Sequence, residues 1–142
     1  MSTPRITIIG ATGNVGRKVA AEVLSQKLTM PSHLTLLASS QSKGKQLTIN
    51  QEVFTVGETT EQSFNNTDLC IFNTESDISA YYVPYALKAG AYVIDSSSHY
   101  RLNPEVPLII PPVNKQSINL KQKLYAHANC LASPIATVLM IH

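Results

Sequence analysis

The chain has 142 residues, of which 44% are hydrophobic and 14% are charged, and its formal net charge is +2. This composition predicts a globular chain of about one domain and excludes an intrinsically disordered one. The small net charge argues against nucleic acid or an anionic membrane as the main partner. No apolar run approaches the ~20 residues that cross a bilayer. No export signal precedes the first predicted strand, so we expect a cytoplasmic protein.

The two cysteines, Cys70 and Cys130, lie far apart in the sequence and form no CxxC or Cys/His pattern. We therefore expect no metal site and, in the cytoplasm, two reduced thiols. Cys70 lies within an apolar run that predicts a buried strand, so we interpret it as a structural side chain.

Strands and helices are predicted to alternate along the first half of the chain. An apolar, β-branched run ends at Gly10, and apolar residues then recur at helical spacing from Asn14 to about Gln26, which predicts a helix. Further apolar runs predict strands, two of which we expect to pair as a short antiparallel hairpin over residues 47–49 and 53–56. The other predicted strands of this half cover residues 5–9, 34–38 and 69–72.

The second half continues the alternation. Residues 78–88 predict a helix that Gly90 closes, with Pro84 as a point where it kinks or shortens. An apolar segment over residues 135–141 predicts a last helix, with Pro134 tolerated in its first turn. The predicted strands of this half cover residues 92–94, 106–110 and 124–126.

This order of elements predicts an α/β fold, namely a Rossmann-like, doubly wound, mostly parallel sheet with helices on both faces. We expect residues 1–142 to form one dinucleotide-binding domain that ends one helix after Cys130, with no second domain in this chain. Such sheets bind ligands at the carboxyl ends of their strands. Polar clusters follow the predicted strands at residues 10–16, 39–45, 73–77, 95–101 and 129–130.

The first polar cluster, Gly10-Ala11-Thr12-Gly13-Asn14-Val15-Gly16, follows a predicted strand and opens a predicted helix. In such a turn the first glycine permits a sharp bend, the second lets the backbone approach a pyrophosphate, and the third lets the helix pack closely. The N–H groups of the first helical turn then face the phosphates. We interpret the cluster as a dinucleotide site rather than a ligand-free glycine turn, with contacts from Gly10, Thr12, Gly13, Asn14, Val15 and Gly16.

The residues after the second strand bear on which dinucleotide is bound. An NAD enzyme usually carries Asp or Glu there to bind the ribose 2′-hydroxyl, whereas this segment has hydroxyls, two lysines and no carboxylate. We therefore expect NADP rather than NAD, with Ser39, Ser42 and Lys43 receiving the 2′-phosphate. The alternative is that Lys43 and Lys45 are merely solvated loop residues.

The residues alone leave the roles of two further side chains undecided. The guanidinium of Arg101, just beyond a strand end, suits a phosphate or carboxylate, but it is equally placed in sequence to pair with Glu105. Cys130 precedes a predicted helix, whose dipole would lower the pKa of its thiol and make it a nucleophile. A lone cysteine is otherwise more often a small buried side chain. We interpret His99 as structural.

Taken together, the polar segments resemble the N-terminal half of aspartate-β-semialdehyde dehydrogenase. The most specific part of the resemblance is the pair of motifs DSSS-x-x-R and VPLIIP-x-VN. The resemblance runs along nearly the whole chain and is carried by residues 10–16, 37–45, 93–101, 106–114 and 126–130.

The resemblance implies a reaction and roles for individual residues. The family uses NADPH to reduce β-aspartyl phosphate to aspartate semialdehyde with release of phosphate, in lysine, threonine and methionine biosynthesis. Cys130 resembles the acylating nucleophile, and Asn129 a residue that positions it. Arg101 resembles the phosphate-binding arginine, and Asn114 a neighbouring substrate-site residue. Ser76, in the segment that corresponds to the nicotinamide side of the family's site, joins the cofactor-binding residues.

The chain also departs from the family pattern. Gln41 stands where the family usually has an arginine, and Asn73-Thr74-Glu75-Ser76 matches the family's small Ser-Ala-Gly-Gly-Ser loop only loosely. Family members are about twice as long, and their second domain supplies an acid/base histidine, an arginine for the substrate carboxylate and the main homodimer interface. Without these groups we expect the chain, as a truncated form, to be poorly active or inactive alone.

Two rival functions stay open. Gln41 and the replaced loop favour a non-catalytic nucleotide-binding module, whereas Arg101 and the Asn129-Cys130 pair favour a preserved enzyme. N-acetyl-γ-glutamyl-phosphate reductase shares the fold and the acyl-phosphate chemistry, although residues 95–98 and 106–114 fit the aspartate enzyme better. For the aspartate enzyme the expected partners are small molecules, namely β-aspartyl phosphate, aspartate semialdehyde and phosphate.

Overall fold

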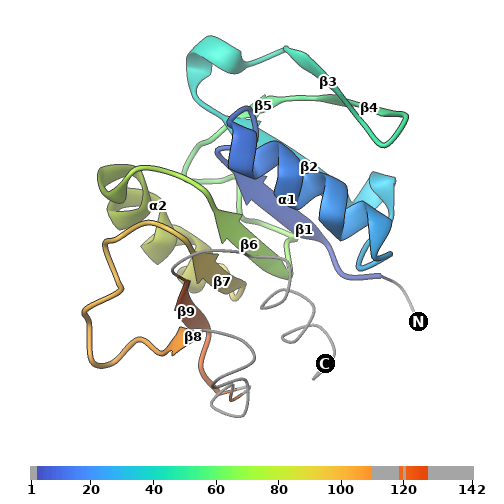
Figure 1. Cartoon of the computed structure of the whole chain (residues 1–142). Coiled ribbons are helices and arrows are strands. Elements are labelled where there is room, and N and C mark those ends of the chain that lie inside the picture. The colour runs from blue at the N-terminus through green and yellow to red at the C-terminus, as the bar shows by residue number, and fades with distance from the viewer. Residues whose placement is uncertain (1–2, 110–118, 120, 128–142) are drawn as a thin grey trace.

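The computed structural model describes residues 3–109, 119 and 121–127. In this part of the chain, seven strands form one sheet with the order β5-β2-β1-β6-β7-β9-β8, and every neighbouring pair is parallel. Figure 1 shows this sheet at the centre of the molecule. Its strands are β1 (Ile6–Ile9), β2 (Leu34–Ala38), β5 (Gly57–Glu58), β6 (Leu69–Phe72), β7 (Tyr92–Asp95), β8 (Leu108–Ile109) and β9 (Leu124–His127).

Apolar side chains on both faces explain why the central strands form. All residues of β1 and of β6 are buried, which is typical of parallel strands that are covered on both sides. Ile6 and Ile8 belong to one core cluster, whereas Ile9 belongs to the other. The alternation of side chains along the strand therefore divides one apolar run between two cores.

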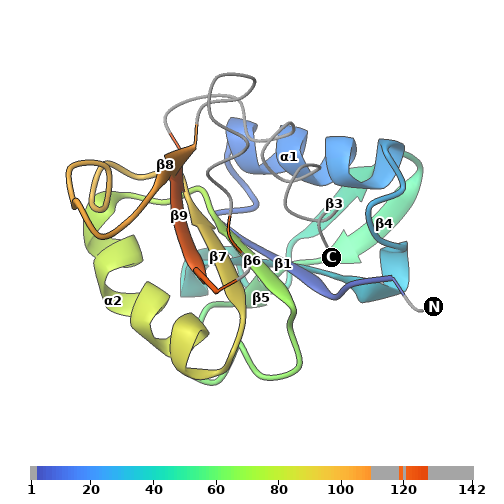
Figure 2. The ribbon, with the colours of Figure 1, turned by 90° about the horizontal axis from the view of Figure 1, so that it is seen from below.

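The two α-helices of the described residues cover opposite faces of the sheet. α1 (Asn14–Ser25) buries Val19 and Val23 in the first core cluster, and α2 (Ser76–Lys88) buries Val83 in the second. Figure 2 shows the helices on either side of the sheet. This arrangement confirms the Rossmann-like, doubly wound fold with helices on both faces.

The end of α2 is closed as the sequence predicts. Gly90 has a φ of +90°, its N–H group donates to the carbonyl oxygen of Leu87, and the N–H group of Ala91 donates to that of Ala86. These two bonds form a Schellman motif, which ends helices at a left-handed residue. Pro84 lies inside α2 and does not end it.

An antiparallel hairpin, formed by β3 (Gln46–Ile49) and β4 (Glu52–Thr55), interrupts the connection between β2 and β5. Its buried side chains Leu47, Ile49 and Phe54 join the core cluster to which α1 contributes. The sequence predicts this hairpin but not β5, because a strand of two residues leaves no apolar pattern to recognise.

The order of the strands reverses at β1. From β1 the chain passes through α1 to β2 on one side, and β6 then pairs with β1 on the other side. Doubly wound sheets bind ligands at such a switch point, outside the carboxyl ends of the strands. The loops that follow β1, β2 and β6 therefore frame the expected site.

β7, β8 and β9 lie where the sequence predicts strands, although β8 begins at Leu108 rather than at residue 106. The predicted helix over residues 135–141 lies outside the described residues. So do three residues of the predicted site, Asn114, Asn129 and Cys130. Among the described helices, none combines the length and the apolarity that a membrane crossing requires.

Candidate functional site

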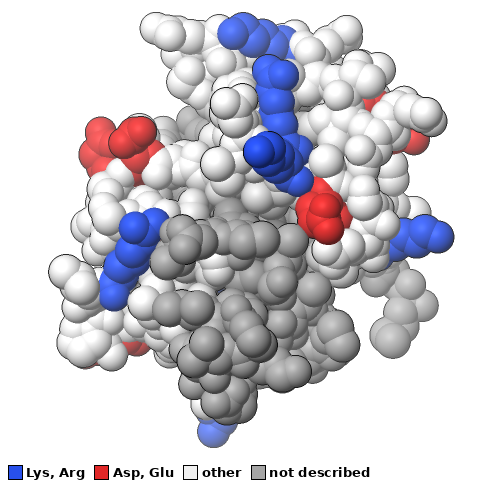
Figure 3. All heavy atoms as spheres, in the orientation of Figure 1, with Lys and Arg blue, Asp and Glu red and all other residues white. Residues whose placement is uncertain are grey.

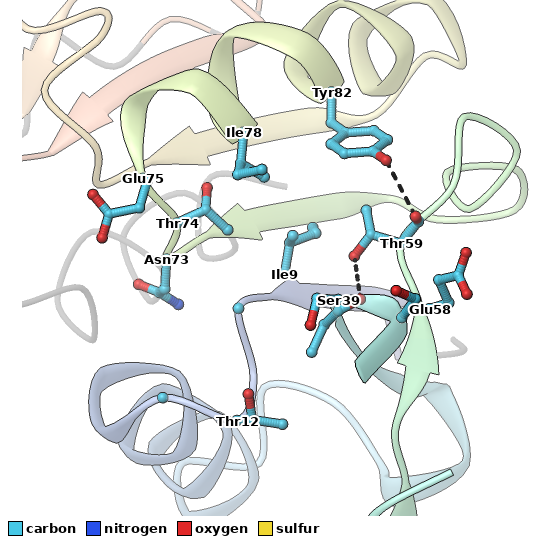
Figure 4. A pocket seen from close by; sticks show the side chains of 14 residues that line it. Ile9, Thr12, Ser39, Glu58, Thr59, Asn73, Thr74, Glu75, Ile78 and Tyr82 are labelled. Carbon is cyan, nitrogen blue, oxygen red and sulfur yellow. Dashed lines mark hydrogen bonds between the residues drawn. The ribbon is translucent and has the colours of Figure 1, made fainter. Parts of the chain in front are cut away.

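A pocket of about 580 Å³ opens at the switch point, beyond the carboxyl ends of β1, β2 and β6. Figure 4 shows its lining residues coming from the turn after β1, the ends of β2 and β5, and the start of α2. A volume of this size is usual for small-molecule and cofactor sites. The lining residues are Ile9, Gly10, Thr12, Gly13, Ala38, Ser39, Ser40, Glu58, Thr59, Asn73, Thr74, Glu75, Ile78 and Tyr82.

Two glycines of the turn after β1 are required by the backbone around them. Gly10 has a φ of +82°, and a Cβ atom there would lie 2.1 Å from the carbonyl oxygen of Asn73. A Cβ atom on Gly16 would lie 2.2 Å from the carbonyl oxygen of Gly10. Close-packed interiors cannot absorb such overlaps without moving the backbone. Gly10 thus bends the chain and Gly16 lets α1 pack against the turn, as the motif predicts.

Gly13 differs from the other two, because the backbone of the protein does not require a glycine there. Its φ is −74°, it is exposed, and a Cβ atom would approach the carbonyl oxygen of Gly10 no closer than 3.6 Å. Gly13 is the N-cap of α1, no side chain caps the helix, and its first turn holds no acidic residue. The missing side chain leaves space beside the N–H groups of the first helical turn, which suits a phosphate.

The wall of the pocket after β2 carries both hydroxyls and a carboxylate. Ser39 and Ser40 line it, and Ser42 and Lys43 follow in the same loop. β5 pairs with the end of β2 and brings Glu58 into the lining. The segment after β2 itself has no carboxylate, as the sequence shows, but a strand from elsewhere in the chain places one at the same end of the pocket.

The loop between β6 and α2 forms the opposite wall. The N–H group of Asn73 donates to the carbonyl oxygen of Ile9 over 2.9 Å, so the loop starts against the turn after β1. Tyr82, on α2, donates its hydroxyl to the carbonyl oxygen of Thr59 over 3.3 Å. Figure 4 shows this bond at the far side of the pocket. It joins α2 to the residue that follows β5.

A buried carboxylate, Asp95, connects α2 with the turn that follows β7. Its side chain is 0% exposed and accepts hydrogen bonds from the hydroxyls of Ser79 and Ser97, each over 2.7 Å, and from the N–H group of Ser97 over 3.1 Å. The hydroxyl of Ser79 also bonds to that of the pocket-lining Thr74, over 2.8 Å. These partners satisfy a group that would otherwise be costly to bury. Burial, and secondly the charge of Asp95, raise the pKa of Tyr100.

Arg101 and Ser76 meet the same turn after β7. Arg101 is half-buried, and its Nη2 atom donates to the carbonyl oxygen of Ser96 over 2.6 Å. The hydroxyl of Ser76, at the start of α2, bonds to the hydroxyl of Ser98 over 2.7 Å. The structure therefore holds the Arg101 guanidinium against its own turn, and it places Ser76 at the edge of that turn.

Cys70 lies in β6 with 0% of its surface exposed. Burial raises the pKa of its thiol to about 12, so the thiol stays protonated and unreactive near neutral pH. The structure thus agrees with a structural role for Cys70. In the part of the chain that the structure describes, no three His, Cys, Asp or Glu side chains are grouped to hold a metal ion.

The structure brings part of the predicted site together. Four predicted cofactor residues line the pocket, namely Gly10, Thr12, Gly13 and Ser39. The first turn of α1, which begins beside them, contains Asn14, Val15 and Gly16. Three others lie next to the lining residues rather than among them: Ser42 ends a short 3-10 helix, Lys43 follows it in a turn, and Ser76 begins α2.

Ten of the fourteen lining residues are not among the predicted cofactor contacts, and three of these ten show what the sequence does and does not signal. Asn73 directly follows a buried strand, which is a place where ligand contacts are expected, so it could have been named. Tyr82 stands four residues after the pocket-lining Ile78, on the same face of a predicted helix. Glu58 gives no such signal, because nothing in the sequence shows that it pairs beside β2.

Figure 3 shows charges of both signs on one face of the molecule. Lysine and arginine side chains form a short row over the upper part of that face, and acidic side chains stand at separate places around it. The charges of the described residues on this face therefore form no broad field of a single sign.

Known proteins match the part of the chain that forms the pocket. The family model for "Semialdehyde dehydrogenase, NAD binding domain" matches residues 5–121. The aspartate-semialdehyde dehydrogenase of Aquifex aeolicus is 37% identical over 129 residues, which make up 89% of this chain and 38% of that protein. The chain thus spans well under half the length of the curated relatives it matches, 40% in the case of the Rickettsia bellii enzyme.

Solved structures share the same fold. Aspartate semialdehyde dehydrogenase II from Vibrio cholerae, complexed with ASA, has a TM-score of 0.79 at 32% identity, and the match covers 96% of this chain and 44% of that chain. The enzyme from Candida albicans, solved with NADP, has a TM-score of 0.70 at 23% identity, with 99% and 46% covered. The chain belongs to the semialdehyde dehydrogenase NAD-binding domain family, and it corresponds to the N-terminal part of aspartate-semialdehyde dehydrogenases.

Proposed function

We propose that this chain is the NADP(H)-binding part of an aspartate-semialdehyde dehydrogenase. The observation that carries the proposal is the pocket at the switch point, one wall of which is the glycine turn after β1. The family model supports a nicotinamide dinucleotide as the ligand. A relative of the same fold was solved with NADP, which supports the choice of that cofactor.

The residues present fit the pyrophosphate of such a cofactor. Gly13 leaves open space at the N-terminus of α1, where no side chain competes for the N–H groups. Thr12 adds a hydroxyl to the same wall. A helix N-terminus with free space in front of it favours negative charge, because its N–H groups and dipole both point outward.

At the end of the pocket proposed for the adenosine of NADP, a positive and a negative side chain have opposite effects on the 2′-phosphate. We propose that Ser39, Ser42 and Lys43 receive the 2′-phosphate, because doubly wound sheets bind the adenosine ribose where the second strand ends. Glu58 lines the same end and opposes this charge. We therefore expect a moderate preference for NADP over NAD rather than a strict one.

The proposed reaction is the reductive dephosphorylation of β-aspartyl phosphate. The Cys130 thiolate attacks the acyl carbon, a carbon–sulfur bond forms, and the bond to the phosphate oxygen breaks with its electron pair leaving on phosphate. Arg101 and Asn114 bind the phosphate side of the substrate, and Asn129 positions the thiol. When bound, the reduced nicotinamide supplies the hydride that turns the thioester into the aldehyde and returns the thiolate.

Further groups for this reaction are proposed to come from outside these 142 residues. The relatives are more than twice as long, since the match covers 38% to 40% of them. We propose that the remaining length supplies an acid/base histidine, an arginine for the substrate carboxylate and the homodimer contacts. The chain on its own is then expected to bind cofactor but to turn over slowly, because general acid–base help and positioning are both missing.

Nucleotide titration tests the cofactor part of the proposal. We expect NADPH to raise the melting temperature of the 142-residue chain and to bind more tightly than NADH in isothermal calorimetry. Equal affinities for NADPH and NADH would contradict the proposed preference for NADP. If neither nucleotide raised the melting temperature or gave a heat of binding, the proposed dinucleotide site itself would be contradicted.

Thiol labelling tests the role of Cys130. Because burial keeps the Cys70 thiol unreactive, with its pKa at about 12, fast alkylation by iodoacetamide near pH 7 reports on Cys130. We expect the C70S variant to keep the fast phase and the C130S variant to lose it. Labelling of Cys130 no faster than that of a free cysteine would favour the non-catalytic nucleotide-binding module instead.

A further inference from the structure

Residues 57–63, which we call the strap, comprise β5 and the start of the turn after it, and they form one side of the pocket. The end of β2 holds the first part of the strap, because the N–H group and the hydroxyl of Thr59 donate to the carbonyl oxygen of Ala38 over 2.9 Å and 3.1 Å. Glu58 and Thr59 line the pocket. Figure 4 shows the Tyr82 hydroxyl reaching Thr59 from α2. The strap thus determines the position of Glu58 beside the pocket.

A second attachment of the strap to α2 lies at its turn. The carboxylate of Glu61 accepts a hydrogen bond from the hydroxyl of Tyr81, and a second one from the hydroxyl of Tyr85 over 3.1 Å. The two tyrosines are four residues apart in α2 and therefore stand on the same side of the helix. Their rings are 5.7 Å apart between centroids. A single carboxylate oxygen, Oε1, thus joins the strap to two points on α2.

The turn of the strap connects Glu61 to Glu58. The N–H group of Ser63 donates to the carbonyl oxygen of Thr60 over 3.1 Å, and the hydroxyl of Ser63 accepts from the N–H group of Thr60 over 2.7 Å. The same hydroxyl donates to the carbonyl oxygen of Glu58 over 3.5 Å. Glu61 stands between Thr60 and Ser63, so its release from α2 loosens the backbone that carries Glu58.

This attachment lies at the surface of the protein rather than in the core. Glu61 is exposed, and 52% of the Tyr81 surface is exposed, so the loss of their bond leaves no buried polar atom without a partner. Substitutions at such positions usually change stability little. A variant of Glu61 is therefore expected to stay folded while the strap is released locally.

We propose that Glu61 is a positioning residue that sets the cofactor preference, because its bonds to Tyr81 and Tyr85 hold Glu58 at the end of the pocket proposed for the 2′-phosphate. The inference rests on the proposed function, since it needs a dinucleotide in the pocket. With the strap held, the Glu58 carboxylate repels the 2′-phosphate and the preference for NADP stays moderate. With the strap released, the carboxylate turns toward water, where the repulsion is screened. Glu61 itself does not line the pocket, so it acts through Glu58.

Calorimetric titration of the 142-residue chain with NADPH and with NADH tests this role. The E61A variant removes the acceptor, and we expect the ratio of the Kd for NADH to the Kd for NADPH to rise about twofold. The E61Q variant keeps an oxygen that accepts from both hydroxyls, so its ratio is expected to stay at the wild-type value. The control is Q62A, at the exposed neighbouring position of the same turn, which is expected to leave the ratio unchanged.

The double variant E58Q/E61A tests whether Glu61 acts through Glu58. Once the charge of Glu58 is gone, release of the strap has no repulsion left to relieve, so adding E61A to E58Q is expected to leave the ratio as it is in E58Q. A merely structural role of Glu61 would weaken the binding of both nucleotides alike and would not move the ratio in either background.

A readout without nucleotide shows whether the attachment is broken. The hydrogen bond to Glu61 raises the pKa of Tyr81, because the carboxylate favours the protonated phenol. Ultraviolet titration of the tyrosines is therefore expected to show the pKa of Tyr81 falling toward its ordinary value in E61A, and the Y81F variant identifies its share of the signal.

The outcomes separate this inference from the proposed function. An unchanged ratio in E61A would overturn the inference, whether or not the pKa of Tyr81 falls. An equal rise in E61A and E61Q would also overturn it, since the charge of Glu61 rather than its bonds would then act on the cofactor. A further rise on adding E61A to E58Q would exclude the route through Glu58. A wild-type chain that binds neither nucleotide would overturn the proposed function and, with it, the role of Glu61.

Discussion

The turns that follow β1 and β7 stand at the same edge of the sheet but keep their shapes by different means. The turn after β1 depends on missing side chains, since a Cβ atom on Gly10 or Gly16 would overlap a backbone oxygen. The turn after β7 depends on side chains that are present. Asp95 there accepts hydrogen bonds from two serine hydroxyls and one N–H group.

This difference bears on what each turn is suited to do. A turn shaped by backbone contacts leaves the N–H groups of the following helix available to a ligand. A turn shaped by side-chain hydrogen bonds has used its polar groups inside the protein. The turn after β1 is therefore suited to hold phosphates, whereas the turn after β7 is suited to hold Arg101 in a fixed place.

The largest expected effect comes from adding a methyl group to the first turn. We expect G10A and G16A each to lower the free energy of unfolding by about 3 to 5 kcal/mol, because the new Cβ atom overlaps backbone that cannot move aside. Urea unfolding measures the loss. The control is G44A, where φ is also positive at +86° but no atom lies within 4 Å. A loss in G16A no larger than that in G44A would contradict the steric explanation.

The second largest effect is expected at Asp95. The D95A variant leaves the buried hydroxyls of Ser79 and Ser97 without their acceptor, so we expect the free energy of unfolding to fall by about 2 to 4 kcal/mol. Thermal unfolding followed by circular dichroism measures it. The S98A variant, at an exposed position of the same turn, is the comparison and should change stability little. If both variants unfold alike, the turn does not depend on the carboxylate.

Gly13 offers a sharper test of the turn after β1, because a substitution there should weaken cofactor binding much more than it lowers stability. The G13A variant is expected to lose about 0.5 to 1 kcal/mol of unfolding free energy, because alanine is a poorer N-cap than glycine while its Cβ atom meets no close contact. Its Kd for NADPH should rise on the order of tenfold, because the methyl group occupies the space in front of α1. Calorimetric titration and urea unfolding of the same sample measure both quantities. Unchanged affinity would mean that phosphate does not approach this glycine.

The smallest expected effect concerns the charge that the fold adds after β2. The E58Q variant is expected to bind NADPH about two- to fivefold more tightly, with NADH affinity nearly unchanged, because it removes a half-buried negative charge from the end proposed for the 2′-phosphate. Titration at low and high salt measures the effect, which should shrink as salt screens the charge. E52Q, at an exposed position of β4, serves as the matched control. Equal gains for both nucleotides would show that Glu58 does not act on the 2′-phosphate.

The sequence predicts the parts of this molecule that depend on local constraints. Buried strands such as β1 and β6 appear as continuous apolar runs, because both of their faces are covered. The bend at Gly10 and the end of α2 at Gly90 are readable because a positive φ strongly favours glycine. These signals were sufficient for the fold and for the wall of the pocket that follows β1.

The sequence does not reveal the parts that depend on pairing between distant segments. Glu58 reaches the pocket through β5, a strand of two residues whose partner lies about twenty residues earlier in the chain. Asp95 is satisfied partly by Ser79, from a different element of the fold. Neither hydrophobic periodicity nor residue spacing encodes such pairs, so both the opposing charge and the buried network required the structure.

The position of Tyr82 in the pocket wall, where its hydroxyl bonds to Thr59, has a consequence for the fluorescence of the protein. The chain contains no tryptophan and six tyrosines, so its ultraviolet emission comes from tyrosine alone. Tyr82 lies in the pocket wall, and its ring is 4.9 Å from that of Tyr81 and 6.2 Å from that of Phe64, between centroids. A ligand that enters the pocket alters the surroundings of this ring. The protein therefore carries its own fluorophore at the site, and a Y82F variant identifies its share of the signal.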